Sequence, residues 1–111
     1  MGHESCGAVK AALTTPRDKT AGSADLDHLI GQIQPHIEGI DRGLASSDPT
    51  LRKPVKANVD GVAARLMQRS KIVRTAVKSG RVKIVPGIYE LKSGKVEFWN
   101  TNVLEATGSD G

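Results

Sequence analysis

The chain opens with Met1-Gly2-His3-Glu4-Ser5-Cys6-Gly7-Ala8-Val9-Lys10-Ala11-Ala12, and the interpretation of the fold starts from this stretch. His3 and Cys6 lie three residues apart, and Cys6 stands just before a run of Ala and Val that can form a helix. The amino end of a helix favours the thiolate form of a cysteine, which is the form that binds zinc. A neutral imidazole from His3 would bring a second ligand to the same ion. Since zinc takes four ligands, three from protein in catalytic sites, the stretch predicts part of a zinc site.

The segment Gly2-His3-x-x-Cys6-Gly7-Ala8-Val9 resembles the second zinc motif of the β-class carbonic anhydrases. In that family a core strand ends at Gly-His, and the Cys opens the next helix. The similarity continues in the family's order and spacing through the remaining segments: Ser23-Ala24-Asp25-Leu26-Asp27-His28-Leu29-Ile30, Ile33-Gln34-Pro35, Asn58-Val59, residues 80–91 and residues 94–99. It therefore covers nearly the whole sequence.

This resemblance implies a zinc enzyme that converts carbon dioxide reversibly to bicarbonate. It makes His3 and Cys6 zinc ligands, and it places the backbone of Gly7 close to the substrate. Some family members use a Tyr in the part of the chain where Tyr89 stands to form an inhibitory bicarbonate site. The alternatives are a buried Cys6 with no metal and a Tyr89 that belongs to the core or to a sheet edge.

The family's other zinc motif, Cys-x-Asp-x-Arg, does not occur in this sequence. In the family it lies before Gly-His, and it provides another Cys ligand and an Asp–Arg pair that controls the water on the metal. We therefore expect a truncated, C-terminal half of the enzyme that lacks the N-terminal sheet strands and is inactive or weakly active alone. Two alternatives stay open: a non-catalytic dimer in which two His3/Cys6 pairs share one zinc, and a remnant that packs with a partner such as a full-length homologue.

The composition indicates one small domain. The chain has 111 residues, of which 38% are hydrophobic and 3% are aromatic, so a modest core must be built from Val, Ile, Leu and Ala. A single Cys excludes an internal disulfide. No apolar run is long enough to span a membrane or to act as a signal peptide, so we expect a cytoplasmic protein without a membrane partner.

Charge is distributed unevenly along the sequence. The first fifty residues hold four Lys or Arg against seven Asp or Glu, a net charge of −3, and the remainder holds twelve against five, a net charge of +7. Such a basic half can indicate nucleic-acid binding. On one long helix, however, Arg65 and Arg69 would flank an apolar stripe on one side and Arg74 and Lys78 on the other, as solvated flanking residues commonly do. With no aromatic platform nearby, we expect no nucleic-acid partner.

Apolar spacing predicts an α/β fold of three helices and a C-terminal β-hairpin. The helices are expected at about residues 5–14, 24–38 and 50–79, and the hairpin strands at about 81–91 and 95–99.

Further expectations concern individual parts of this fold. Pro35 should kink or end the second helix. On that helix, His28 and His36 are expected to be partly solvated surface histidines rather than replacement ligands. We assign residues 1–100 to a single partial domain and 101–111 to a flexible tail. Because the sheet strands that the helices would cover are missing, we expect exposed apolar area on the helices at 54–79 and 25–37, and hence a homo-oligomer or poor solubility.

Overall fold

The computed structural model describes residues 1–16, 22–41, 43 and 47–100. In chain order the elements are β1 (Gly2–His3), α1 (Gly7–Thr14), α2 (Ala24–Ile33), the 3₁₀ helix η1 (Gln34–Ile37), α4 (Arg52–Arg69), α5 (Lys71–Lys78), β2 (Gly87–Tyr89) and β3 (Val96–Phe98). The predicted α/β class is therefore confirmed. None of the described helices is long and apolar enough to cross a membrane. The expected tail at 101–111 lies outside the described residues.

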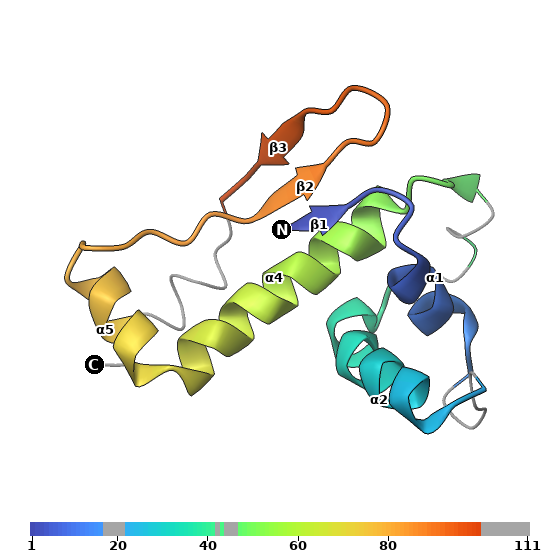
Figure 1. Cartoon of the computed structure of the whole chain (residues 1–111), viewed down its shortest axis with the longest axis horizontal. Helices are drawn as coiled ribbons and strands as arrows, with labels where there is room; N and C mark the ends of the chain where they lie inside the picture. The colour runs from blue at the N-terminus through green and yellow to red at the C-terminus, as the bar shows by residue number, and fades with distance from the viewer. Residues whose placement is uncertain (17–21, 42, 44–46, 101–111) are drawn as a thin grey trace.

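A small mixed sheet lies on one side of α4 (Figure 1). Strand β1 pairs in parallel with β2, so that Gly2 faces Ile88, and β2 pairs antiparallel with β3. The predicted strand over 81–91 was too long, because the strand begins only at Gly87. Pro86, directly before it, has no N–H to donate to a neighbouring strand.

The core forms where α4 meets the sheet and the first helices. Gly2 lies directly on α4: a Cβ atom there would come within 2.6 Å of Val55 and 2.8 Å of Val59. The apolar spacing of the sequence is confirmed in α1, α2 and α4, which supply most of the buried residues: Val9, Ala12, Leu13, Ile30, Ile33, Ile37, Leu51, Val55, Val59 and Ile88. Pro35 lies in η1, directly after α2 ends, so the predicted end of the second α-helix near Pro35 is confirmed.

The long helix predicted over 50–79 is wrong, because Ser70 divides it into α4 and α5. Ser70 has extended backbone angles, and its hydroxyl accepts a hydrogen bond from the Val73 N–H as the N-cap of α5. Arg74 in turn donates to the carbonyl groups of Met67 and Gln68, which the end of α4 leaves without a helical partner. Arg74 therefore caps α4 and does not flank a stripe of the same helix.

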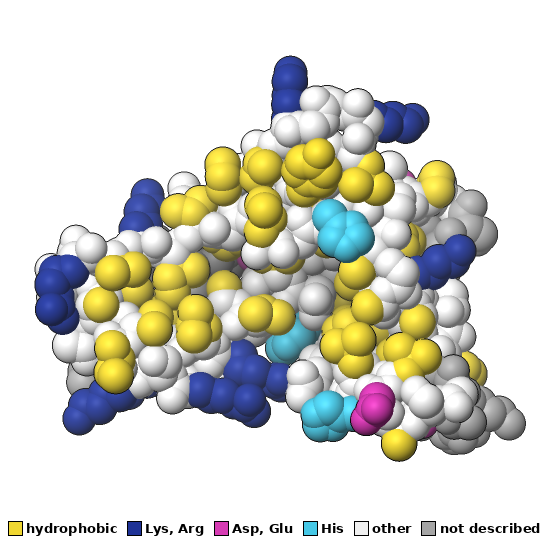
Figure 2. Space-filling view, viewed as in Figure 1, with side chains coloured by type: hydrophobic (Ala, Val, Ile, Leu, Met, Phe, Trp, Pro, Cys, Tyr) yellow, Lys and Arg dark blue, Asp and Glu magenta, His cyan; other side chains and the backbone are white. Residues whose placement is uncertain are grey.

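Several apolar side chains of the helices are exposed, as the sequence predicted. Helix α5 buries no residue, and Ile72 on it is 84% exposed. Val62 and Leu66 on α4, and Leu29 on α2, are exposed as well. Figure 2 shows apolar side chains gathered over α5 and the C-terminal part of α4, with Lys and Arg around their margin. The oligomer expected from this surface stays a prediction.

The imidazole of His36 packs directly against the backbone of α4 at Gly61. A Cβ atom at position 61 would overlap the His36 ring, so only glycine leaves room for it. Burial lowers the pKa of His36 from its usual 6.5, and the positive charge of Arg65 lowers it further. His36 is therefore half-buried against α4 and His28 is exposed, which agrees with the prediction of partly solvated histidines.

We predict that Gly61→Ala lowers the free energy of unfolding by about 1–3 kcal/mol, because η1 must move away from α4 to admit the methyl group. Gly31→Ala is the matched control, since it also replaces a helical glycine but meets no atom within 4 Å. Its expected effect is a gain of roughly 0.5–1 kcal/mol from helix propensity. Urea denaturation of the two variants measures both changes, and equal effects would exclude the close contact.

We also predict that His36 makes the protein less stable as the pH falls. The pKa of His36 is below 6.5 in the folded chain, so the unfolded chain takes up the proton first. Stability should therefore decline from pH 6.5 downward until the pH reaches the folded pKa. Denaturation midpoints across this window should become less pH-dependent in His36→Gln and stay as in the wild type in His28→Gln. The same slope in both variants would assign the effect to other groups.

Candidate metal centre

The turn between β1 and α1 carries the two candidate ligands and is held by a distant loop. Ser5 adopts a left-handed backbone conformation with φ of 57°. Its N–H donates to the Thr50 carbonyl at 2.7 Å, and its hydroxyl donates to the Pro49 carbonyl at 2.8 Å. A left-handed conformation is unfavourable for a residue other than glycine. The two hydrogen bonds offset this cost and hold the turn in place.

His3 lies at the end of β1 with an exposed side chain. Its Nδ1 is 3.0 Å from the Glu4 carbonyl oxygen. Because a carbonyl oxygen can only accept, Nδ1 must carry the proton, which leaves Nε2 of the neutral ring free to bind a metal. A backbone carbonyl that holds the second ring nitrogen is a common feature of metal-binding histidines.

Cys6 is the residue before α1 and occupies its N-cap position. Its side chain is half-buried, packs against the core and lines a groove of about 300 Å³ beside α4. No side chain caps the helix here, so the first N–H groups of α1 stay available to a thiolate or another anion. Gly7, the first residue of α1, is exposed, and a Cβ atom there would meet nothing within 4 Å.

The described part of the chain offers no complete metal site. No three His, Cys, Asp or Glu side chains among those residues lie close enough together to hold one ion. His28 is hydrogen-bonded to Gln32 on α2, and the ring of His36 packs against Gly61 on α4. His3 and Cys6 thus fit zinc in donor type, although two ligands are fewer than the ion requires.

Two further residues stand close to this turn. Tyr89 pairs with His3 across the sheet, so the two side chains point to the same face. Asn58 lines the same groove as Cys6, and its Oδ1 atom is buried with no hydrogen-bond partner. The sequence could have indicated Asn58 as a candidate site residue. It lies three residues after Val55 and four before Val62, so its polar amide falls on the apolar face of the helix.

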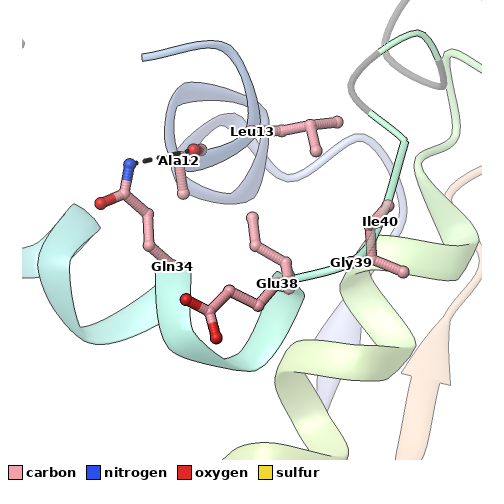
Figure 3. A pocket seen from close by; sticks show the side chains of 7 residues that line it. Ala12, Leu13, Gln34, Glu38, Gly39 and Ile40 are labelled. Carbon is pink, nitrogen blue, oxygen red and sulfur yellow. Dashed lines mark hydrogen bonds between the residues drawn. The ribbon is translucent and has the colours of Figure 1, made fainter. Parts of the chain in front are cut away.

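A second pocket, of about 150 Å³, lies between α1 and the end of η1 (Figure 3). Gln34 reaches across it, and its amide donates to the carbonyl groups of Ala12 and Thr15. Neither His3 nor Cys6 lines this pocket. Gln34 therefore provides hydrogen bonds to carbonyl groups at the C-terminal end of α1 that lack a helical partner. We assign the pocket a structural role.

Comparison with known proteins gives consistent matches. A family model described as carbonic anhydrase matches residues 1–96. The chain is 32% identical over 99 residues to a carbonic anhydrase of Mycolicibacterium smegmatis, covering 88% of this chain and 46% of that protein. It is 31% identical over 96 residues to carbonic anhydrase 2 of Mycobacterium tuberculosis, covering 86% of this chain and 44% of that protein. No solved structure matches the chain.

The chain thus spans less than half the length of these relatives. The family match nevertheless extends over most of its residues, including the His3–Cys6 turn, α4 and the β2–β3 hairpin up to Val96. On this match the chain belongs to the carbonic anhydrase family, in its β class.

Proposed function

We propose that His3 and Cys6 bind zinc and that the reaction served by this centre is the reversible hydration of carbon dioxide to bicarbonate. The observation that carries the proposal is the bond from His3 Nδ1 to the Glu4 carbonyl, which leaves Nε2 free to bind an ion. Family membership supports the same chemistry. Zinc, when bound, makes water acidic enough to supply the nucleophile that attacks carbon dioxide at neutral pH.

The chain's own residues would hold the ligands and shield the reacting atoms from bulk water. Ser5 fixes the turn through its bonds to Pro49 and Thr50. The groove beside Cys6 is lined mainly by apolar side chains, among them Val9 and Val59, which suit an apolar gas better than water. The N–H of Gly7 would point toward a substrate oxygen, and Tyr89 beside His3 is our candidate for a bicarbonate contact.

Activity of this chain alone should be low, because His3 and Cys6 supply only two ligands. The sequence has no Cys-x-Asp-x-Arg motif to complete the coordination. The main alternative is a zinc ion shared by two chains, each giving one His and one Cys. The exposed side chain of His3 favours this alternative, since a second chain could approach it.

We predict that the purified protein contains zinc and that His3→Gln and Cys6→Ser lose it. About one zinc per two chains would indicate the shared site, and about one per chain a site completed by water. His28→Gln is the matched control and should keep the wild-type zinc content, because His28 bonds only within α2. Elemental analysis together with native mass spectrometry measures the ratio. A wild-type protein without zinc would contradict the proposal.

A second prediction concerns catalysis. Stopped-flow measurement of carbon dioxide hydration should give a rate at most slightly above the uncatalysed one, and Cys6→Ser should remove any excess. A shared, closed zinc site has no open position and should give no excess at all. Activity that persists in Cys6→Ser after its zinc is lost would assign catalysis to other residues.

A further inference from the structure

The two residues between the candidate ligands, Glu4 and Ser5, are both bonded to residues 49–52, the segment that leads into α4. Ser5 bonds to two carbonyl groups of this segment, as described above. The Glu4 carboxylate accepts a hydrogen bond of 3.1 Å from the guanidinium of Arg52, the first residue of α4. The His3–Cys6 turn is thus held by contacts at sequence separations of 44 and 48 residues.

Every polar group of Glu4 has a partner. Its N–H donates to the Tyr89 carbonyl at 3.0 Å, and its carboxylate accepts a hydrogen bond of 3.1 Å from the Leu91 N–H in addition to the one from Arg52. Its own carbonyl oxygen lies 3.0 Å from Nδ1 of His3. Because Glu4 is only 8% exposed and is bonded on all sides, its carbonyl is kept in place beside the His3 ring.

Arg52 is the residue that makes this arrangement of Glu4 stable. Among the described residues it is the only Lys or Arg that pairs with the Glu4 carboxylate. A buried carboxylate that loses its cation turns toward water, because burial of an unpaired charge is strongly unfavourable. Since the carboxylate and the carbonyl belong to the same residue, such a movement would also displace the carbonyl from His3 Nδ1.

We propose that Arg52 is a positioning residue for the metal centre: it holds Glu4, and the Glu4 carbonyl in turn keeps the His3 proton on Nδ1, so that Nε2 can bind zinc. The inference rests on the zinc binding proposed above and adds a residue that controls it from outside the ligand set. Contacts that orient a ligand in this way typically change metal affinity by about 10- to 100-fold. A purely structural Arg52 would affect stability and leave the affinity and the His3 tautomer unchanged.

Zinc affinity, measured by competition with a chromophoric chelator, tests the proposal. Arg52→Met should weaken zinc binding at least ten-fold, and Arg52→Lys, which keeps the positive charge, should bind zinc more tightly than Arg52→Met. Lys56→Met is the matched control and should keep the wild-type affinity, because Lys56 also joins α4 to the hairpin but is bonded to Glu97 and not to Glu4.

The outcomes of this experiment separate the two proposals. A wild-type chain that binds no zinc would contradict the zinc centre itself and with it the role of Arg52. A wild-type chain that binds zinc, together with equal affinities of Arg52→Met and Lys56→Met, would overturn only the role of Arg52.

The tautomer of His3 provides a readout that needs no metal. Nitrogen-15 NMR at about pH 8, where free histidine is neutral, distinguishes a proton on Nδ1 from one on Nε2. In the metal-free wild type we expect the His3 proton on Nδ1, and in Arg52→Met a shift of the population toward Nε2. His28 is the internal control, because it bonds within α2 and should keep its tautomer in both proteins. An unchanged His3 tautomer in Arg52→Met would overturn the proposal.

A second variant is needed if circular dichroism shows that Arg52→Met is unfolded. Glu4→Ala then replaces it, because this change removes the buried carboxylate and leaves Arg52 paired with Glu90 and Glu97. It should show the same loss of zinc affinity and the same shift of the His3 tautomer. Wild-type values of both quantities in Glu4→Ala would overturn the proposal.

Discussion

The side chain of Arg52 joins the segment after β1 to the β2–β3 hairpin at the start of α4. It is the first residue of α4, and its guanidinium donates to three carboxylates: Glu4 after β1, Glu90 after β2 and Glu97 in β3. Glu4 is 8% exposed and also accepts a hydrogen bond from the Leu91 N–H, so its charge is compensated within the protein. Without the guanidinium, a buried carboxylate would stay unpaired, which is strongly destabilising. The position of the His3–Cys6 turn relative to α4 depends on this contact.

A second cation extends the same network. Lys56, one turn along α4, binds Glu97 at 3.1 Å and lies over the ring of Trp99, whose indole N–H donates to Asp60. The bond from Lys56, together with the charge of Arg52, lowers the pKa of Glu97. The hairpin is thus fixed to α4 by ionic and aromatic contacts, whereas Val62 and Leu66 farther along α4 are left exposed.

Much of the fold could be predicted from local patterns, and the remainder depends on contacts between distant residues. The spacing of Val9, Ala12 and Leu13 predicted α1, and Pro35 predicted the end of α2. Both predictions were possible because each depends only on residues within or next to one helix. The break at Ser70 was missed because apolar spacing continues across it; only the bonds of Ser70 and Arg74 show the two helices. For the site, residue types identified His3 and Cys6 as candidates. The hydrogen bond of His3 Nδ1, the pairing of Tyr89 with His3 and the missing hydrogen-bond partner of Asn58 Oδ1 could be found only in the three-dimensional structure.

The left-handed conformation of Ser5 has a consequence for the order in which this protein assembles. That conformation costs roughly 1–2 kcal/mol, and the bonds that offset it come from Pro49 and Thr50, with a separation of 44 residues between Ser5 and Pro49. Leu51, beside them, also has a positive φ, so both sides of the contact are strained. Neither turn is favoured until the other is present. The turn that carries His3 and Cys6 should therefore form together with the turn at Leu51, and a zinc ion bound there as proposed would slow the unfolding of both.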